Sequence, residues 1–95
     1  MKTSITQAHV DKMNAFCGEI EKALRNGGVW NCEIFPDSDF RDVIVEIYDG
    51  DWKHEHLRAV WIIEELGGEH LGEWLLEDSD SDCYSAGHRF SFNGI

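Results

Sequence analysis

The sequence is poor in positive charge and in proline, and it contains no long hydrophobic run. Eight Lys and Arg residues stand against nineteen Asp and Glu residues, which gives a formal net charge of −11. Proteins that bind nucleic acid directly draw most of their affinity from clustered Lys and Arg on phosphates, so this balance argues against that class. An anionic surface instead attracts the basic surfaces of other proteins.

Cysteine is also scarce. Cys17, Cys32 and Cys83 are odd in number and form no CxxC pair, which argues against a secreted disulfide framework. No segment approaches the ~18 apolar residues of a membrane span. No apolar stretch follows Met1 that is long enough for a signal peptide. We therefore expect a soluble protein of a reducing cytoplasm.

What is present favours a folded protein. Hydrophobic residues make up 42% of the chain and aromatic residues 12%, whereas disordered acidic segments have few aromatic residues. A length of 95 residues corresponds to one domain, which we place at residues 1–95.

The N-terminal part predicts an amphipathic helix. Ser4 followed by Gln7 fits a capping box, and Gly27 with Gly28 provides the end of the helix. Apolar residues recur every three or four positions and form one stripe, at Val10, Met13, Cys17, Ile20 and Leu24.

Two alternating segments follow, at residues 30–34 and 43–48, with a turn at 36–39 between them. They predict an antiparallel hairpin. Asp51 is a suitable N-cap for a second helix over residues 52–66, which Gly67 and Gly68 would end.

The last third is ambiguous, because Leu71, Trp74 and Leu75 also fit a helical turn. We prefer a strand over residues 73–77, since the second half of the chain repeats the order of the first. A last strand alternates from Tyr84 to Phe92. The predicted fold is α+β, in the order α-β-β-α-β-β, with two helices packed on one face of an antiparallel four-stranded sheet.

No motif identifies a metal site or a reaction. Asp78, Asp80 and Asp82 occupy the first, third and fifth places of a calcium loop, but Cys83 and Arg89 at the sixth and twelfth exclude an EF-hand. Loose cation binding by this acidic turn stays open.

His54 and His56, two positions apart on a helix, would point to different faces and could not hold one ion. The chain also lacks a GxSxG elbow and a phosphate-binding loop. We therefore predict no metal, no cofactor and no enzymatic activity.

Negative charge is concentrated towards the C-terminal end. Eight carboxylates lie between Glu64 and Asp82 without one Lys or Arg among them. In length and charge the chain resembles small acidic phage proteins that inhibit bacterial defence, the anti-CRISPR and anti-restriction proteins, which mimic nucleic acid. It also resembles immunity proteins that block nuclease toxins. No diagnostic motif accompanies either resemblance.

The resemblance implies an inhibitor that occupies a basic, nucleic-acid-binding surface of a defence complex or nuclease, without touching nucleic acid or membrane itself. The alternatives are an immunity protein and a non-catalytic module that forms homodimers. Leu57 and Trp61, off the core stripe of the second helix, are an expected apolar anchor. The expected acidic contact residues are Asp37, Asp39, Asp42, Glu73, Glu77, Asp78, Asp80 and Asp82.

Overall fold

The computed structural model describes residues 6–77 and 83–93. These ranges contain two α-helices and four strands, in the predicted α-β-β-α-β-β order. The elements are α1 (Gln7–Asn26), β1 (Cys32–Pro36), β2 (Asp42–Asp51), α2 (Leu57–Glu65), β3 (Gly68–Glu77) and β4 (Cys83–Phe92), with a π-helical turn (Trp52–His56) leading into α2.

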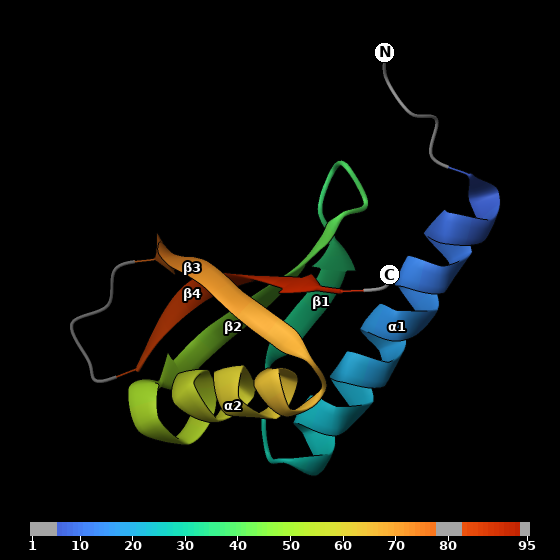
Figure 1. Ribbon diagram of the computed structural model, residues 1–95. Coiled ribbons are helices and arrows are strands. Elements are labelled where there is room, and N and C mark those ends of the chain that lie inside the picture. Colours follow the sequence, from blue (N-terminus) through green and yellow to red (C-terminus); the bar gives the residue numbers. More distant parts are fainter. Residues whose placement is uncertain (1–5, 78–82, 94–95) are drawn as a thin grey trace.

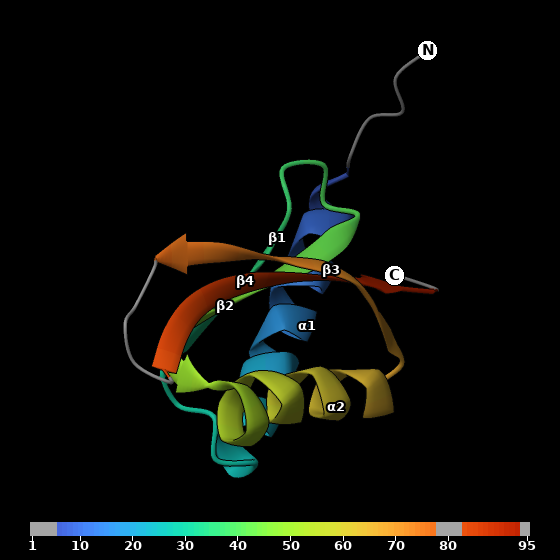
Figure 2. The same cartoon turned by 90° about the vertical axis from the view of Figure 1, so that its left-hand side faces the viewer.

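The four strands form one sheet in the order β1-β2-β4-β3, and every neighbouring pair is antiparallel. β2 and β4 are therefore central, and β1 and β3 are the edge strands. Both helices cover the same side of the sheet, with α1 against β1 and α2 against β3 (Figures 1 and 2). The predicted α+β arrangement is confirmed.

The core fills the space between the helices and this side of the sheet. The predicted stripe of α1 supplies one wall, and alternate residues of β2 supply the other, because strand side chains point to opposite faces in turn. The core side chains shielded completely from solvent include Ile20, Leu24, Val43, Val45, Ile47, Ile63 and Phe90.

The beginning of α1 differs from the prediction. The hydroxyl of Thr6 accepts a hydrogen bond from the backbone N–H of His9 at 3.1 Å, so Thr6 is the N-cap and Gln7 is the first helical residue. The predicted capping pair of Ser4 and Gln7 is therefore wrong, and Ser4 itself lies outside the described residues. Thr6 offers the same hydroxyl as Ser4, two positions further along the chain.

The second helix has the predicted N-cap. The carboxylate of Asp51 accepts a hydrogen bond from the backbone N–H of His54 at 2.6 Å. Residues 52–66 are not one α-helix, however, because the first turn is π-helical and α2 spans Leu57–Glu65. Gly67 follows with a φ of 99°, a left-handed conformation that glycine adopts without strain.

The strand predicted at residues 73–77 is confirmed, and it starts earlier, at Gly68. Its pairing with β4 is interrupted twice, at Leu71 and at Leu76, where β3 has one extra residue. His70 pairs with Phe90 and Glu73 with His88. Residues three apart on a regular strand point to opposite faces, so the bulge at Leu71 brings His70 and Glu73 to the same face.

Candidate functional site

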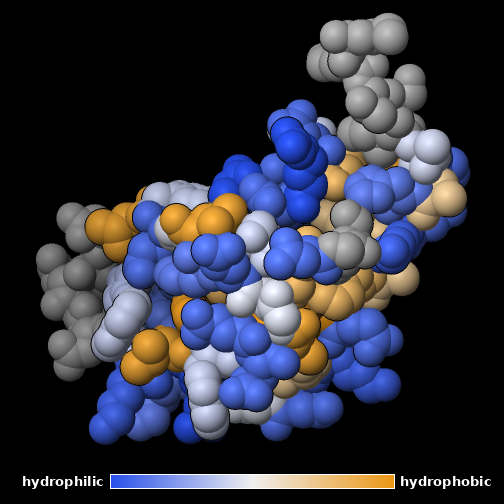
Figure 3. Space-filling model, in the orientation of Figure 1, coloured by the Kyte–Doolittle hydropathy of each residue, from blue (hydrophilic) through white to orange (hydrophobic). Residues whose placement is uncertain are grey.

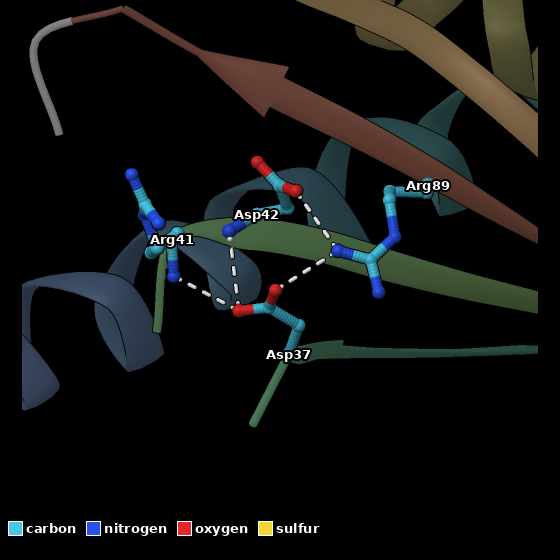
Figure 4. A network of polar contacts seen from close by, with 4 residues as sticks. All are labelled: Asp37, Arg41, Asp42 and Arg89. Carbon is cyan, nitrogen blue, oxygen red and sulfur yellow. Dashed lines mark hydrogen bonds and ion pairs between the residues drawn. The ribbon is translucent and has the colours of Figure 1, made fainter. Parts of the chain in front are cut away.

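Two of the predicted acidic contact residues are engaged inside the protein. Asp37 and Asp42 each form an ion pair with the same guanidinium nitrogen of Arg89, at 2.9 Å in both cases (Figure 4). Asp37 also accepts hydrogen bonds from the backbone N–H groups of Arg41, at 2.9 Å, and Asp42, at 3.2 Å. Its side chain is only 9% exposed. These two carboxylates therefore stabilise the β1–β2 turn and connect it to β4.

The surroundings of Asp37 also change its acidity. Burial by itself would raise the pKa of this carboxyl group. The hydrogen bonds from the backbone of Arg41 and Asp42 and from the Arg89 side chain outweigh burial, and the pKa lies below its ordinary value. Asp37 is therefore ionised at neutral pH and is already satisfied by internal partners.

Of the other predicted acids that the structure describes, Asp39 and Glu73 form no ion pair with Arg89. Asp39 is exposed in the same turn. In the register of the sheet, Asp42 lies opposite Ser91, and Glu73 lies opposite His88. Ser91 and His88 are three residues apart on β4, so Asp42 and Glu73 belong to opposite faces of the sheet. Asp78, Asp80, Asp82 and the side chain of Glu77 lie outside what the structure describes.

The predicted apolar anchor is accessible. Trp61 is 66% exposed and Leu57 is 45% exposed, and together they line an open depression of about 410 Å³ on α2. Charged residues of both signs, Lys53, Arg58 and Glu64, border it.

Three large apolar residues of the edge strand β3 are also exposed, Leu71, Trp74 and Leu75. Trp74 and Leu75 are consecutive, so they point to opposite faces of the sheet. Figure 3 shows apolar side chains at the upper left, over the C-terminal end of β3, with hydrophilic side chains between them.

Further exposed carboxylates flank the connection between α2 and β3. Glu64 and Glu65 are the last two residues of α2, and Glu69 is the second residue of β3. All three are exposed, and none is paired with a Lys or Arg of the described residues. The first three carboxylates of the acidic run are therefore exposed and have no Lys or Arg partner among the described residues.

A chain of three histidines crosses the interface between β3, β4 and the π-helical turn. Nε2 of His70 lies 3.2 Å from Nδ1 of His88, and Nε2 of His88 lies 3.0 Å from Nδ1 of His56. Nε2 of His56 lies 3.0 Å from the backbone carbonyl of Tyr84. The ring of His56 also stacks on that of Tyr84, with centroids 4.2 Å apart. His56 and His88 are fully buried.

The carbonyl at the end of this chain fixes the tautomers of all three rings when they are neutral. A carbonyl only accepts, so Nε2 of His56 carries the hydrogen and its Nδ1 is an acceptor. Nε2 of His88 must then donate to His56, which leaves Nδ1 of His88 with a lone pair directed at His70. Burial, together with the nearby His56 and His70, lowers the pKa of His88 to about 4. His88 is therefore neutral at pH 7.

Glu73 completes this cluster. One ligand atom from each of His70, Glu73 and His88 lies within 4.8 Å of the others. Sequence reasoning missed the cluster, because His70 and Glu73 are three apart on a strand and His88 is remote in sequence. Gly72 between them was the available signal, since glycine inside a strand often marks a bulge.

His54 and His56, which the sequence analysis considered as metal ligands, do not converge on one site. The imidazole of His54 contacts the carboxylate of Asp51 at 2.8 Å, while His56 points into the core.

None of the helices in the described ranges has the length and hydropathy needed to cross a membrane. Comparison with protein-family models, with curated proteins and with solved structures finds no match to this chain.

Proposed function

We propose that this protein is a non-catalytic inhibitor that binds a basic, nucleic-acid-binding surface of another protein, in the manner of anti-CRISPR and anti-restriction proteins. The observation that carries the proposal is negative charge that the chain's own cations leave unpaired. Among the described residues, arginine ion pairs reach only Glu21, Asp37 and Asp42. A partner surface rich in Lys and Arg can pair with the remaining carboxylates and associate quickly through electrostatic steering.

The proposed contact region is centred on the connection between α2 and β3. Glu64 borders the same depression as Leu57 and Trp61, so charge and exposed apolar surface are adjacent there. A tryptophan that becomes buried at an interface often supplies a large share of the binding energy. Asp37 and Asp42 leave the contact set because they hold Arg89. The acidic contact set is then Glu64, Glu65, Glu69 and Glu73, with Asp39, Glu77, Asp78, Asp80 and Asp82 added on charge alone.

The partner is a nuclease or a ribonucleoprotein complex of bacterial defence, met in the cytoplasm. An immunity protein against a nuclease toxin would use the same contacts. The exposure of Leu57 and Trp61 favours a different alternative, in which two copies of the chain cover these residues by pairing through α2. Light scattering separates the two alternatives by molar mass. A wild-type dimer that becomes a monomer in Trp61→Ala supports pairing through α2, and a wild-type monomer contradicts it.

The experiment is affinity capture from bacterial lysate at low and high salt, followed by displacement of nucleic acid from each captured protein. One variant carries Glu65→Lys and Glu69→Lys. A matched control carries Glu19→Lys and Glu33→Lys, two exposed acids on α1 and β1. Both variants change the net charge equally, so a difference between them reports position and not total charge.

The proposal expects a captured nucleic-acid-binding protein that releases its nucleic acid when the wild-type chain is added. Capture should weaken strongly at high salt and with the first variant, and only slightly with the control. Equal losses with both variants would show diffuse charge attraction and would contradict the proposed contact region. A captured protein that keeps its nucleic acid would contradict the inhibitor function.

A further inference from the structure

The cluster of His70, Glu73 and His88 has a feature that hydrogen bonding does not explain. Buried histidines are usually satisfied by hydrogen bonds, and the bonds of His56 and His88 fit that expectation. Glu73 does not, since its carboxylate converges on the two imidazoles, yet no hydrogen bond or ion pair among the described residues holds it. The carboxylate lies within 4.8 Å of one nitrogen of each imidazole, so a single bound ion can lie between the three groups.

The spacing of the two imidazoles suits a metal ion. When Zn–N bonds are about 2.0–2.1 Å, two ligand nitrogens of a tetrahedral ion are about 3.3–3.4 Å apart. Nε2 of His70 and Nδ1 of His88 are 3.2 Å apart. The two nitrogens therefore already have the separation that one ion bound to both of them requires, and turning of the rings can direct both at the ion. The Glu73 side chain, which is exposed and adjustable, supplies the third ligand.

The orientation of His88 is set in the way that metal ligands require. A ligating histidine usually donates its other ring N–H to a fixed acceptor, which holds the ring and its tautomer. Nε2 of His88 donates to His56, and His56 in turn donates to the carbonyl of Tyr84. His56 is thus a positioning residue, which keeps the lone pair of His88 Nδ1 directed at the cluster.

We propose that His70, Glu73 and His88 form a binding site for a divalent transition-metal ion of the zinc class. Two imidazoles and one carboxylate leave a fourth position for water or for a donor atom of a partner. On binding, the proton on Nε2 of His70 moves to Nδ1 of the same ring through solvent, so neutral residues release no net proton. The exposed Glu73 on the edge strand gives the ion a route from solvent. This site does not rest on the proposed inhibitor function, although Glu73 belongs both to this site and to the proposed acidic contact set.

The test uses the full chain without a histidine tag, stripped of metal by a chelator. Zn²⁺ is added in a calorimeter, and Co²⁺ is followed by its visible absorption, which is strong in four-coordinate sites. The ligand variants are Glu73→Gln and His70→Gln, because these side chains are exposed and half-buried and the fold should tolerate them. The control is His54→Gln, which removes an exposed imidazole outside the cluster.

We expect one ion per chain and a four-coordinate Co²⁺ spectrum for the wild-type protein and for the control. Each ligand variant should weaken binding by more than about 100-fold, since even an outer-shell partner costs about 10–100-fold. Zn²⁺ should also shift the ring ¹⁵N resonances of His70 and His88. Weak binding of several ions, or equal affinity in the wild-type protein and Glu73→Gln, would show an adventitious ion only and would overturn the proposal.

Discussion

The contact between Trp74 and Gly87 gives a test of how the helix-free face of the sheet is built. The two residues are cross-strand partners on β3 and β4. A Cβ added at Gly87 would lie 2.5 Å from two carbons of the Trp74 ring and 2.7 Å from its nitrogen, so the ring lies directly on the glycine. Gly87→Ala must therefore displace Trp74. Trp74 is 40% exposed, so the larger part of its surface is covered by the protein.

The magnitude follows from the area at stake. A tryptophan buries about 150–250 Å² when fully covered. At about 25 cal/mol per Å², the covered part of Trp74 contributes about 2–4 kcal/mol if the ring is expelled completely. Partial displacement should cost Gly87→Ala about 1–3 kcal/mol of unfolding free energy. In a Trp74→Ala background the same change should be neutral or stabilising by about 0.5–1 kcal/mol, because alanine replaces a flexible glycine within a strand.

The assay is urea unfolding of the four proteins of this double-mutant cycle, followed by far-ultraviolet circular dichroism, since Trp74 itself contributes to fluorescence. The expected coupling is about 2 kcal/mol, well beyond the ~0.5 kcal/mol within which independent sites add. If Gly87→Ala costs the same in both backgrounds, the ring does not rest on Gly87 and the reasoning is refuted.

Two further predictions concern the polar networks. Because the pKa of Asp37 is lowered in the folded state, its stabilisation is fully present above the ordinary value of 3.8 and is lost as pH falls through the folded value. Asp37→Asn should therefore be less stable than the wild-type protein at neutral pH, and its free energy of unfolding in urea should fall less as the pH is lowered to about 2. If the free energies of both proteins fall in parallel with pH, the role of the contacts between Asp37 and Arg89 is contradicted. In the metal-free protein at neutral pH, ¹⁵N–¹H correlation spectra should show His56, His70 and His88 all protonated at Nε2, and an Nδ1–H tautomer of His88 would refute the inferred direction of the hydrogen-bond chain.

Much of the fold could be predicted from the sequence because its signals are local. The apolar stripe from Val10 to Leu24 requires only the period of a helix, and the alternation at Val43 and Val45 requires only that of a strand. Asp51 caps the following turn through an atom three residues away. The cap of α1 was misplaced, because Ser4 and Thr6 both carry a suitable hydroxyl and nothing local distinguishes them.

The candidate sites depended on the sheet order and could not be predicted in the same way. Arg89 binds Asp42 and Asp37, which are 47 and 52 positions away, and it thereby removes two acids from the expected contact surface. Nothing in the charge pattern indicates which carboxylates an internal arginine will pair with. Equally, the acidic run marks Glu64 as charged, but only the structure places it beside an exposed tryptophan.

Residue type and spacings of a few positions are enough to specify the succession of helices and strands, the excess of negative charge and the apolar faces. The tertiary structure alone decided the meeting of His70, Glu73, His88 and His56. His88 is 18 positions from His70 and 32 from His56. The pairing of β3 with β4 brings them together, and a one-residue bulge at Leu71 turns Glu73 to the same face. Long-range pairing and register depend on how the whole chain packs, and no local pattern specifies them.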